Sequence, residues 1–231
     1  MRSVRIILLT AVLCAAGSIP AAAQGDAYAL LDRIQAVYAR INDYRADITA
    51  SVDMKGLSVP EMKATVYFKK PDRMHIESDG FAMLPRDAVG FHPDMFEKEQ
   101  FDAVIQGKEK IAGVSCVKLK LLARDDSVRL QRAMLYVDPA RDVVLRMDAD
   151  PGQGASAQAE FTYTKVQGKY WLPSAIDITM DAPMRMRRPG TKPRGDDNDG
   201  KARISLRYTN YVVNKGISDS VFDNAKKGKM K

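Results

Sequence analysis

The sequence predicts a mainly β (α+β) fold, in which a curved antiparallel sheet forms an incomplete barrel with an N-terminal helix and a short helical lid. Three observations lead to this prediction: one helical repeat near the start, at least eight later segments with alternating apolar and polar residues, and turn sequences between them. Eight strands with one apolar face each cannot pack flat against one short helix. We therefore expect the sheet to curl around its apolar side.

The first element is a targeting segment, residues 1–23. Arg2 and Arg5 precede an apolar run from Ile6 to Ala16, and three small residues at 21–23 end the segment. This pattern is typical of a secretory signal peptide, which we expect to be cleaved before Gln24. The apolar run is shorter than the roughly 20 residues that a membrane-spanning helix requires.

Residues 24–231 are expected to form a single domain. The composition, 45% apolar and 28% charged, is that of a globular protein. Cleavage would remove Cys14 and leave Cys116 alone, so no intramolecular disulfide is predicted. It would also lower the net charge from +7 to +5 by removing two arginines. A diffuse positive charge favours anionic membrane surfaces over specific nucleic-acid binding, which we do not expect.

The pattern after the signal predicts one amphipathic helix and then strands. Asp26–Ile41 carries an apolar stripe at helical spacing, and from Tyr44 to Met54 the period changes to two. The later rows of apolar residues, each expected on one face of a strand, are Ala64, Val66 and Phe68; Met74 and Ile76; Val117, Leu119 and Leu121; Val143, Leu145 and Met147; Phe161 and Tyr163; Ile176, Ile178 and Met180; and Ile204 and Leu206. Turn sequences between several of these rows predict an antiparallel meander.

Two segments interrupt the strand pattern. Residues 81–107 contain Pro85 and Pro93, with a short helical hint around Phe96 and Phe101, and are interpreted as a lid or plug. Residues 182–201 are rich in proline, glycine and charge, and they are longer than a hairpin turn. We expect them to form a flexible insertion loop.

Catalytic patterns are absent from the sequence. It has two histidines, His75 and His92, and it lacks HExxH, GxSxG and a cysteine pair. His75 falls on a polar strand face, His92 precedes a proline, and Cys116 is interpreted as a buried strand residue. We therefore expect no enzyme activity, catalytic residue, metal or cofactor, although an enzyme acting on lipids stays as a minor alternative.

Methionine is frequent on the predicted apolar face of the strands. A flexible thioether side chain adapts to irregular apolar guests, so a cavity for acyl chains would explain this enrichment. An ordinary core in which methionine fills gaps explains it equally well, and the residues alone do not separate the two interpretations. The methionines concerned are Met54, Met74, Met147 and Met180.

Three segments, taken in order and with the opening helix, resemble one known family. The segments Tyr67–Met74, Gly113–Leu119 and Gly168–Pro173 are similar to those of the outer-membrane lipoprotein-sorting family, the LolA-like periplasmic carriers. The resemblance covers nearly all of residues 24–231. It implies a periplasmic, monomeric carrier that takes the acyl chains of a lipoprotein from an inner-membrane transporter to an outer-membrane acceptor without covalent chemistry.

The resemblance also assigns roles to individual residues. It implies that Val66, Phe68, Met74 and Ile76 line the acyl-chain cavity, and that Lys70 latches the lid. The family carries arginine at the position of Lys70, and lysine lacks the planar fork of arginine. The 182–201 insertion is a second departure, which leaves the partner open. An envelope-stress sensor or a lipid-binding regulatory module of the same fold is therefore the alternative function.

Overall fold

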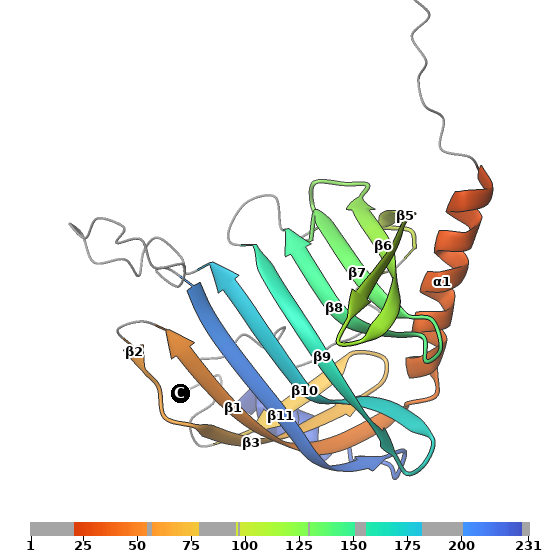
Figure 1. Cartoon of the computed structure of the whole chain (residues 1–231). Coiled ribbons are helices and arrows are strands. Elements are labelled where there is room, and N and C mark those ends of the chain that lie inside the picture. Colours follow the sequence, from red (N-terminus) through yellow and green to blue (C-terminus); the bar gives the residue numbers. More distant parts are fainter. Residues whose placement is uncertain are drawn as a thin grey trace, which may run out of the picture.

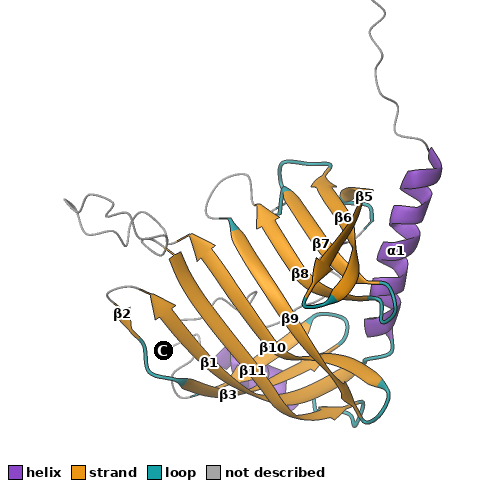
Figure 2. Ribbon diagram, viewed as in Figure 1, coloured by secondary structure: helices purple, strands orange, loops and turns teal. Residues whose placement is uncertain are grey.

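The computed structural model describes residues 21–54, 57–78, 96, 98–128, 130–150, 156–181 and 201–227. They form one antiparallel sheet with a helix near each of its two edges (Figures 1 and 2). The elements are α1 (Ala21–Ala39), β1 (Asp43–Met54), β2 (Leu57–Ser58), β3 (Met62–Lys69), β4 (Arg73–Glu77), β5 (Phe101–Ile111), β6 (Val114–Ala123), β7 (Arg132–Asp138), β8 (Val143–Asp150), β9 (Ala157–Val166), β10 (Tyr170–Asp181), β11 (Lys201–Val213) and α3 (Ser220–Lys227).

The strand order is β4-β3-β1-β11-β10-β9-β8-β7-β6-β5, with β2 paired to β1 alone. Chain neighbours pair throughout this order, with two exceptions: β1 pairs with β3 across the short β2, and β1 pairs with β11. β4 and β5 are the two edges, and the chain between them includes residues 79–95, which lie outside the described residues. The sheet therefore curls without closing, as Figure 1 shows, and the predicted incomplete barrel is confirmed.

One face of the sheet carries the main core, and we call it the inner face. Buried and half-exposed residues alternate along β1 and β3, so Ala46, Ile48 and Val66 point to the same side. Ile176 of β10 and Leu206 of β11 are register partners on this face. Alternation of this kind buries one face of each strand, and register shifts in β1, β5, β7 and β10 add local bends.

Helix α1 packs against β5 and β8 and fills the inner face at that end of the sheet (Figure 1). Leu30, Leu31 and Ile34, spaced on one helical stripe, are buried in the main core. The Tyr28 hydroxyl donates to the carbonyl of Phe101 in β5 at 3.3 Å. The predicted helix is confirmed with shifted bounds. It starts at Ala21, before the predicted cleavage point, and ends at Ala39.

Helix α3 packs against β4 at the opposite edge. Asp219, next to its first residue, forms ion pairs with Lys69 at 2.6 Å and with Arg73 at 2.8 Å. The sequence pattern does not identify this helix. Neither α1 nor α3, the α-helices of the described residues, has the length and apolar character that a membrane-crossing helix needs.

Two sequence predictions are corrected. The lid interpretation of residues 81–107 is wrong from Phe101 onward, because Phe101–Ile111 is β5 and pairs with β6. A bulge and several exposed polar residues interrupt its alternation after Ala103. The prediction that Val143, Leu145 and Met147 share one face of β8 is also wrong. A register shift places Val144 in the main core, while Val143 and Leu145 belong to a smaller cluster around Cys116. Strand β7 escaped prediction because it is buried on both faces over much of its length.

Candidate functional site

The four residues predicted to line an apolar cavity lie together on two neighbouring strands. Val66 of β3 pairs with Ile76 of β4, and Phe68 pairs with Met74. All four side chains share one face, because paired residues of an antiparallel ladder point to the same side. Val66 and Phe68 are buried, whereas Met74 and Ile76 are half-buried against the main core. The edge strand therefore carries the more accessible half of this set.

An aromatic row continues the inner face from β3 across β1 to β11. The Tyr44 ring lies 5.3 Å from the Phe68 ring and 5.9 Å from the Tyr211 ring, and Tyr208 stacks on Tyr211 at 6.2 Å. Burial raises the pKa of the Tyr44, Tyr208 and Tyr211 hydroxyls, which stay neutral at physiological pH. Tyr44 begins the alternating segment that the sequence predicts, whereas the two tyrosines of β11 do not stand out in the sequence pattern.

Half-buried aliphatic and methionine side chains extend along the same face. Ile178 and Met180 of β10 pack against the main core, as do Met74 and Ile76 of β4. Of the four methionines that the sequence singles out, Met74, Met147 and Met180 belong to this packing. Unbranched thioether side chains can change rotamer at little cost, so this part of the inner face can adapt to an apolar guest.

Lys70 joins the turn between β3 and β4 to the C-terminal end of α1. Its Nζ donates to the Ala39 carbonyl at 2.6 Å, and its backbone N–H donates to the Asn42 carbonyl at 2.8 Å. A cation near the last carbonyls of a helix is favourable. The Lys70–Pro71 peptide bond is cis. Residues 81–95 of the predicted lid lie outside the described residues, so the latch stays a prediction. Phe96 itself is fully buried against Phe101.

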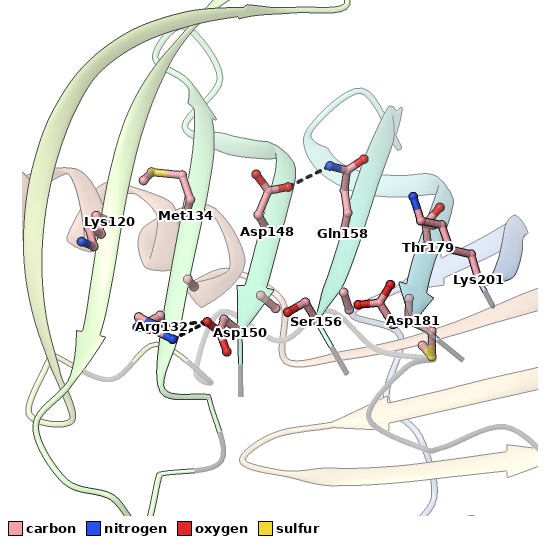
Figure 3. Close-up of a pocket in the computed structure, with 14 residues that line it drawn as sticks. Lys120, Arg132, Met134, Asp148, Asp150, Ser156, Gln158, Thr179, Asp181 and Lys201 are labelled. Carbon is pink, nitrogen blue, oxygen red and sulfur yellow. Dashed lines mark hydrogen bonds and ion pairs between the residues drawn. The ribbon is translucent and has the colours of Figure 1, made fainter. Parts of the chain in front are cut away.

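The outer face of the sheet carries a cleft of about 460 Å³ across β7, β8, β9 and β10. Figure 3 shows the row of side chains that crosses it, and the register places each beside the next: Lys120, Met134, Asp148, Gln158 and Thr179. A second row at the strand ends includes an ion pair from Arg132 to Asp150 at 2.6 Å. The sequence does not predict this cleft, because the cleft depends on the register between strands.

Asp148 holds the centre of the cleft. Arg146 donates to its two oxygens at 2.8 and 2.9 Å, Gln158 at 3.0 Å and Tyr136 at 3.0 Å. Burial acts to raise the pKa of Asp148, but these hydrogen bonds outweigh it and the pKa is lowered. Burial and the same carboxylate raise the pKa of Tyr136 to about 12. The centre of the cleft is thus a hydrogen-bonded polar network around an ionised Asp148, which can contact polar groups.

The other candidate reactive groups have structural surroundings. His75 lies on the polar face of β4 and stacks on Tyr67, with ring centroids 6.1 Å apart. Cys116 is fully buried, and burial raises the pKa of its thiol, which makes the reactive thiolate less accessible. His92 lies outside the described residues. Within the described ranges, no group of three or more His, Cys, Asp or Glu residues could hold a metal ion.

Comparison with known proteins finds similarity in structure only. No family model and no curated protein sequence matches the chain. A DUF1329 family protein from Desulfovibrio piger superposes with a TM-score of 0.61 and 14% identity, over 88% of this chain and 98% of that one. A putative outer membrane lipoprotein-sorting protein domain from Vibrio parahaemolyticus gives 0.59 and 13%, over 87% and 98%. A LolA superfamily protein from Nitrosomonas europaea gives 0.53 and 11%, over 85% and 96%.

The chain has a LolA-like fold. At these identities the similarity establishes the fold, which is the fold that the resemblance in sequence implies. The LolA-like fold spans most of this chain and nearly all of each neighbour.

Proposed function

We propose that this protein is a periplasmic carrier that binds the acyl chains of lipoproteins, or related lipids, against its inner face and delivers them to the outer membrane. The observation that carries the proposal is a continuous apolar inner face in a sheet that stays open between β4 and β5. A curled sheet that closed fully would leave no seam for a guest. The fold shared with a lipoprotein-sorting domain supports the same conclusion.

The arrangement of residues suggests how an acyl chain is held. Val66 and Phe68 form the buried floor, and Met74 and Ile76 on the edge strand meet the guest first. Burial of each methylene group contributes about 0.8 kcal/mol, so a sixteen-carbon chain could gain on the order of 12 kcal/mol before the costs of binding. Apolar contact alone can therefore retain a lipid, and binding of this kind needs no catalytic residue or cofactor.

The wider assignment follows from the same proposal. Residues 1–23 would direct export and be removed, and residues 24–231 would fold as one domain that acts as a monomer in the periplasm. Of the predicted insertion loop, residues 182–200 lie outside the described residues, and Lys201 is the first residue of β11. The partners would be an inner-membrane transporter that loads the acylated cargo and an outer-membrane acceptor that receives it.

Uptake of a fluorescent fatty acid tests the binding face. Ile76→Glu puts a charge among the apolar residues and should abolish uptake, because an isolated carboxylate is costly in an apolar site. His75→Glu makes the matched control, since it adds the same group one residue away on the opposite face of β4. Unchanged uptake by folded Ile76→Glu protein would overturn the assignment. Native mass spectrometry with lipid extraction, on protein purified from a periplasm, would identify the natural cargo.

Lys70 gives a second test of the same proposal. We expect Lys70→Ala to release the turn between β3 and β4 from the Ala39 carbonyl and to change the rate of lipid exchange. Lys70→Arg, which restores a cationic donor, should keep the exchange rate close to that of the unmodified protein. Equal rates in all three proteins would remove Lys70 from the lid mechanism.

A transfer assay separates a carrier from a sensor of the same fold. Donor membranes loaded with an acylated lipoprotein are mixed with acceptor membranes in the presence of the protein. Movement of the lipoprotein to the acceptor supports the carrier. A stable complex with an inner-membrane regulator, without any transfer, would favour the envelope-stress sensor.

A further inference from the structure

Several cations gather at one end of the sheet around the single tryptophan of the chain. We call this surface the basic rim and define it as Arg40, Arg141, Lys165, Lys169, Trp171 and Lys215. The rim residues come from the end of α1, the turn between β7 and β8, the hairpin of β9 and β10, and the segment after β11. Elements far apart in sequence thus meet at one end of the curled sheet, where the strands β1, β8 and β10 begin.

Side-chain contacts join the rim into one surface. Arg141 lies over the Trp171 ring with its guanidinium carbon 5.3 Å from the centroid, and the Lys165 Nζ lies 5.8 Å from the same ring. Lys169 lies over the neighbouring Tyr170 ring at 5.0 Å. The Asn214 amide donates both to the Tyr170 hydroxyl and to the Arg40 carbonyl, at 2.9 and 2.8 Å. Two cations therefore lie over the Trp171 ring, and further cations lie nearby.

The acidic residues Asp43, Asp138 and Asp142 on these elements already form hydrogen bonds or ion pairs. Asp43 is buried and accepts hydrogen bonds from the backbone N–H groups of Lys215 and Gly216. Asp138 is buried against Arg141, and Asp142 pairs with Arg33 at 3.1 Å. Arg40, Lys165, Lys169 and Lys215 are exposed, and no ion pair joins them to another described residue. The rim consequently presents a net positive surface to the solvent.

The cationic side chains and the tryptophan of the rim together fit one kind of partner. Lysine and arginine are attracted to anionic headgroups, and each one close to such a surface strengthens binding by about fivefold. The amphipathic indole of tryptophan prefers the boundary between water and hydrocarbon. We propose that the basic rim docks on the surface of a phospholipid bilayer that contains anionic lipids. This docking is distinct from acyl-chain binding at Ile76 and goes beyond the proposed carrier function.

Vesicle co-sedimentation tests the docking surface. The probes are vesicles of phosphatidylethanolamine with phosphatidylglycerol, and vesicles of phosphatidylcholine alone as the uncharged reference. The protein should bind the first kind and not the second, and binding should weaken as salt is added. Trp171 is the only tryptophan, so a blue shift of its emission on binding would report directly from the rim. Binding without any change in Trp171 emission would overturn the proposal.

Matched charge reversals locate the surface. Lys165→Glu with Lys169→Glu alters the rim, whereas Lys63→Glu with Lys201→Glu changes the net charge equally at the opposite strand ends. We expect the rim variant to lose at least about tenfold in vesicle affinity and the control to lose less than about threefold. Equal losses would show that net charge alone drives binding and would overturn the assignment.

Two further readouts keep the proposal separate from its alternatives. The rim variant should still take up the fluorescent fatty acid, so a failure of membrane docking and a failure of the carrier function are distinguishable. Binding to native inner-membrane vesicles, with no binding to vesicles made of lipid alone, would instead assign the rim to an acidic protein partner and overturn a lipid surface.

Discussion

Leu31→Ala tests whether α1 packs into a close-packed core. The Leu31 side chain is fully buried on the inner stripe of α1, within the main core. The substitution removes three carbon atoms, and at about 0.8 kcal/mol each the transfer contribution is about 2.4 kcal/mol. An unfilled cavity adds to this loss, and Leu→Ala changes in other cores cost about 2.7 to 5.0 kcal/mol. We expect the free energy of unfolding to fall by about 3 kcal/mol.

Urea denaturation followed by circular dichroism gives this quantity, and thermal unfolding gives a second measure. For a domain of this size, a loss of 3 kcal/mol corresponds to a decrease in Tm of about 6 to 12 °C. Leu31→Met serves as the control, because a volume-conserving change should cost less than about 1.5 kcal/mol. A loss below about 1 kcal/mol for Leu31→Ala would refute tight packing of α1 against β5 and β8.

Three other predictions concern titration and reactivity. In an alkaline titration followed by tyrosinate absorbance, six of the nine tyrosines should ionise only above pH 10, because burial raises their pKa values. The stability that these six contribute should be lost as the pH rises through their raised pKa values. Ionisation of all nine near pH 10 would contradict the burial of these six. Asp148 has a lowered pKa in the folded state, so its contribution is present above about pH 4 and lost on acidification. Asp148→Asn should therefore flatten the decrease in stability below pH 4, measured by urea denaturation across pH. Cys116 should react with a thiol reagent only after denaturation, and rapid labelling of the native protein would show that the β6–β7 region opens.

Most strands could be predicted from the sequence because their burial is one-sided. In β1, β3, β10 and β11 the inner residues alternate with polar ones, and the period of two is visible directly. The exceptions have physical causes. β5 contains a bulge near Gly107, and β7 is buried on both sides, so neither shows the alternation on which the prediction depends.

The candidate site could be predicted in part. The pairing of Val66 with Ile76 and of Phe68 with Met74 follows from a hairpin whose strands were both identified. The aromatic row from Tyr44 to Tyr211 depends on β1 pairing with β11, and these strands are separated by most of the chain. Long-range register of this kind leaves no local pattern. The basic rim likewise joins elements far apart in the chain. The outer-face cleft depends on the register of the consecutive strands β6 to β10, of which β7 was not predicted.

The two helices have a consequence for self-association. An unclosed sheet exposes unpaired N–H and C=O groups along both edge strands, and such edges can pair with a second molecule. Here α1 lies against β5, while α3 is tied to β4 through Asp219. A helix therefore packs against each edge strand of the seam, which limits the room for strand addition by a second molecule. Loss of α3 would expose β4 and convert the seam from a route for guests into a site for dimerisation or aggregation.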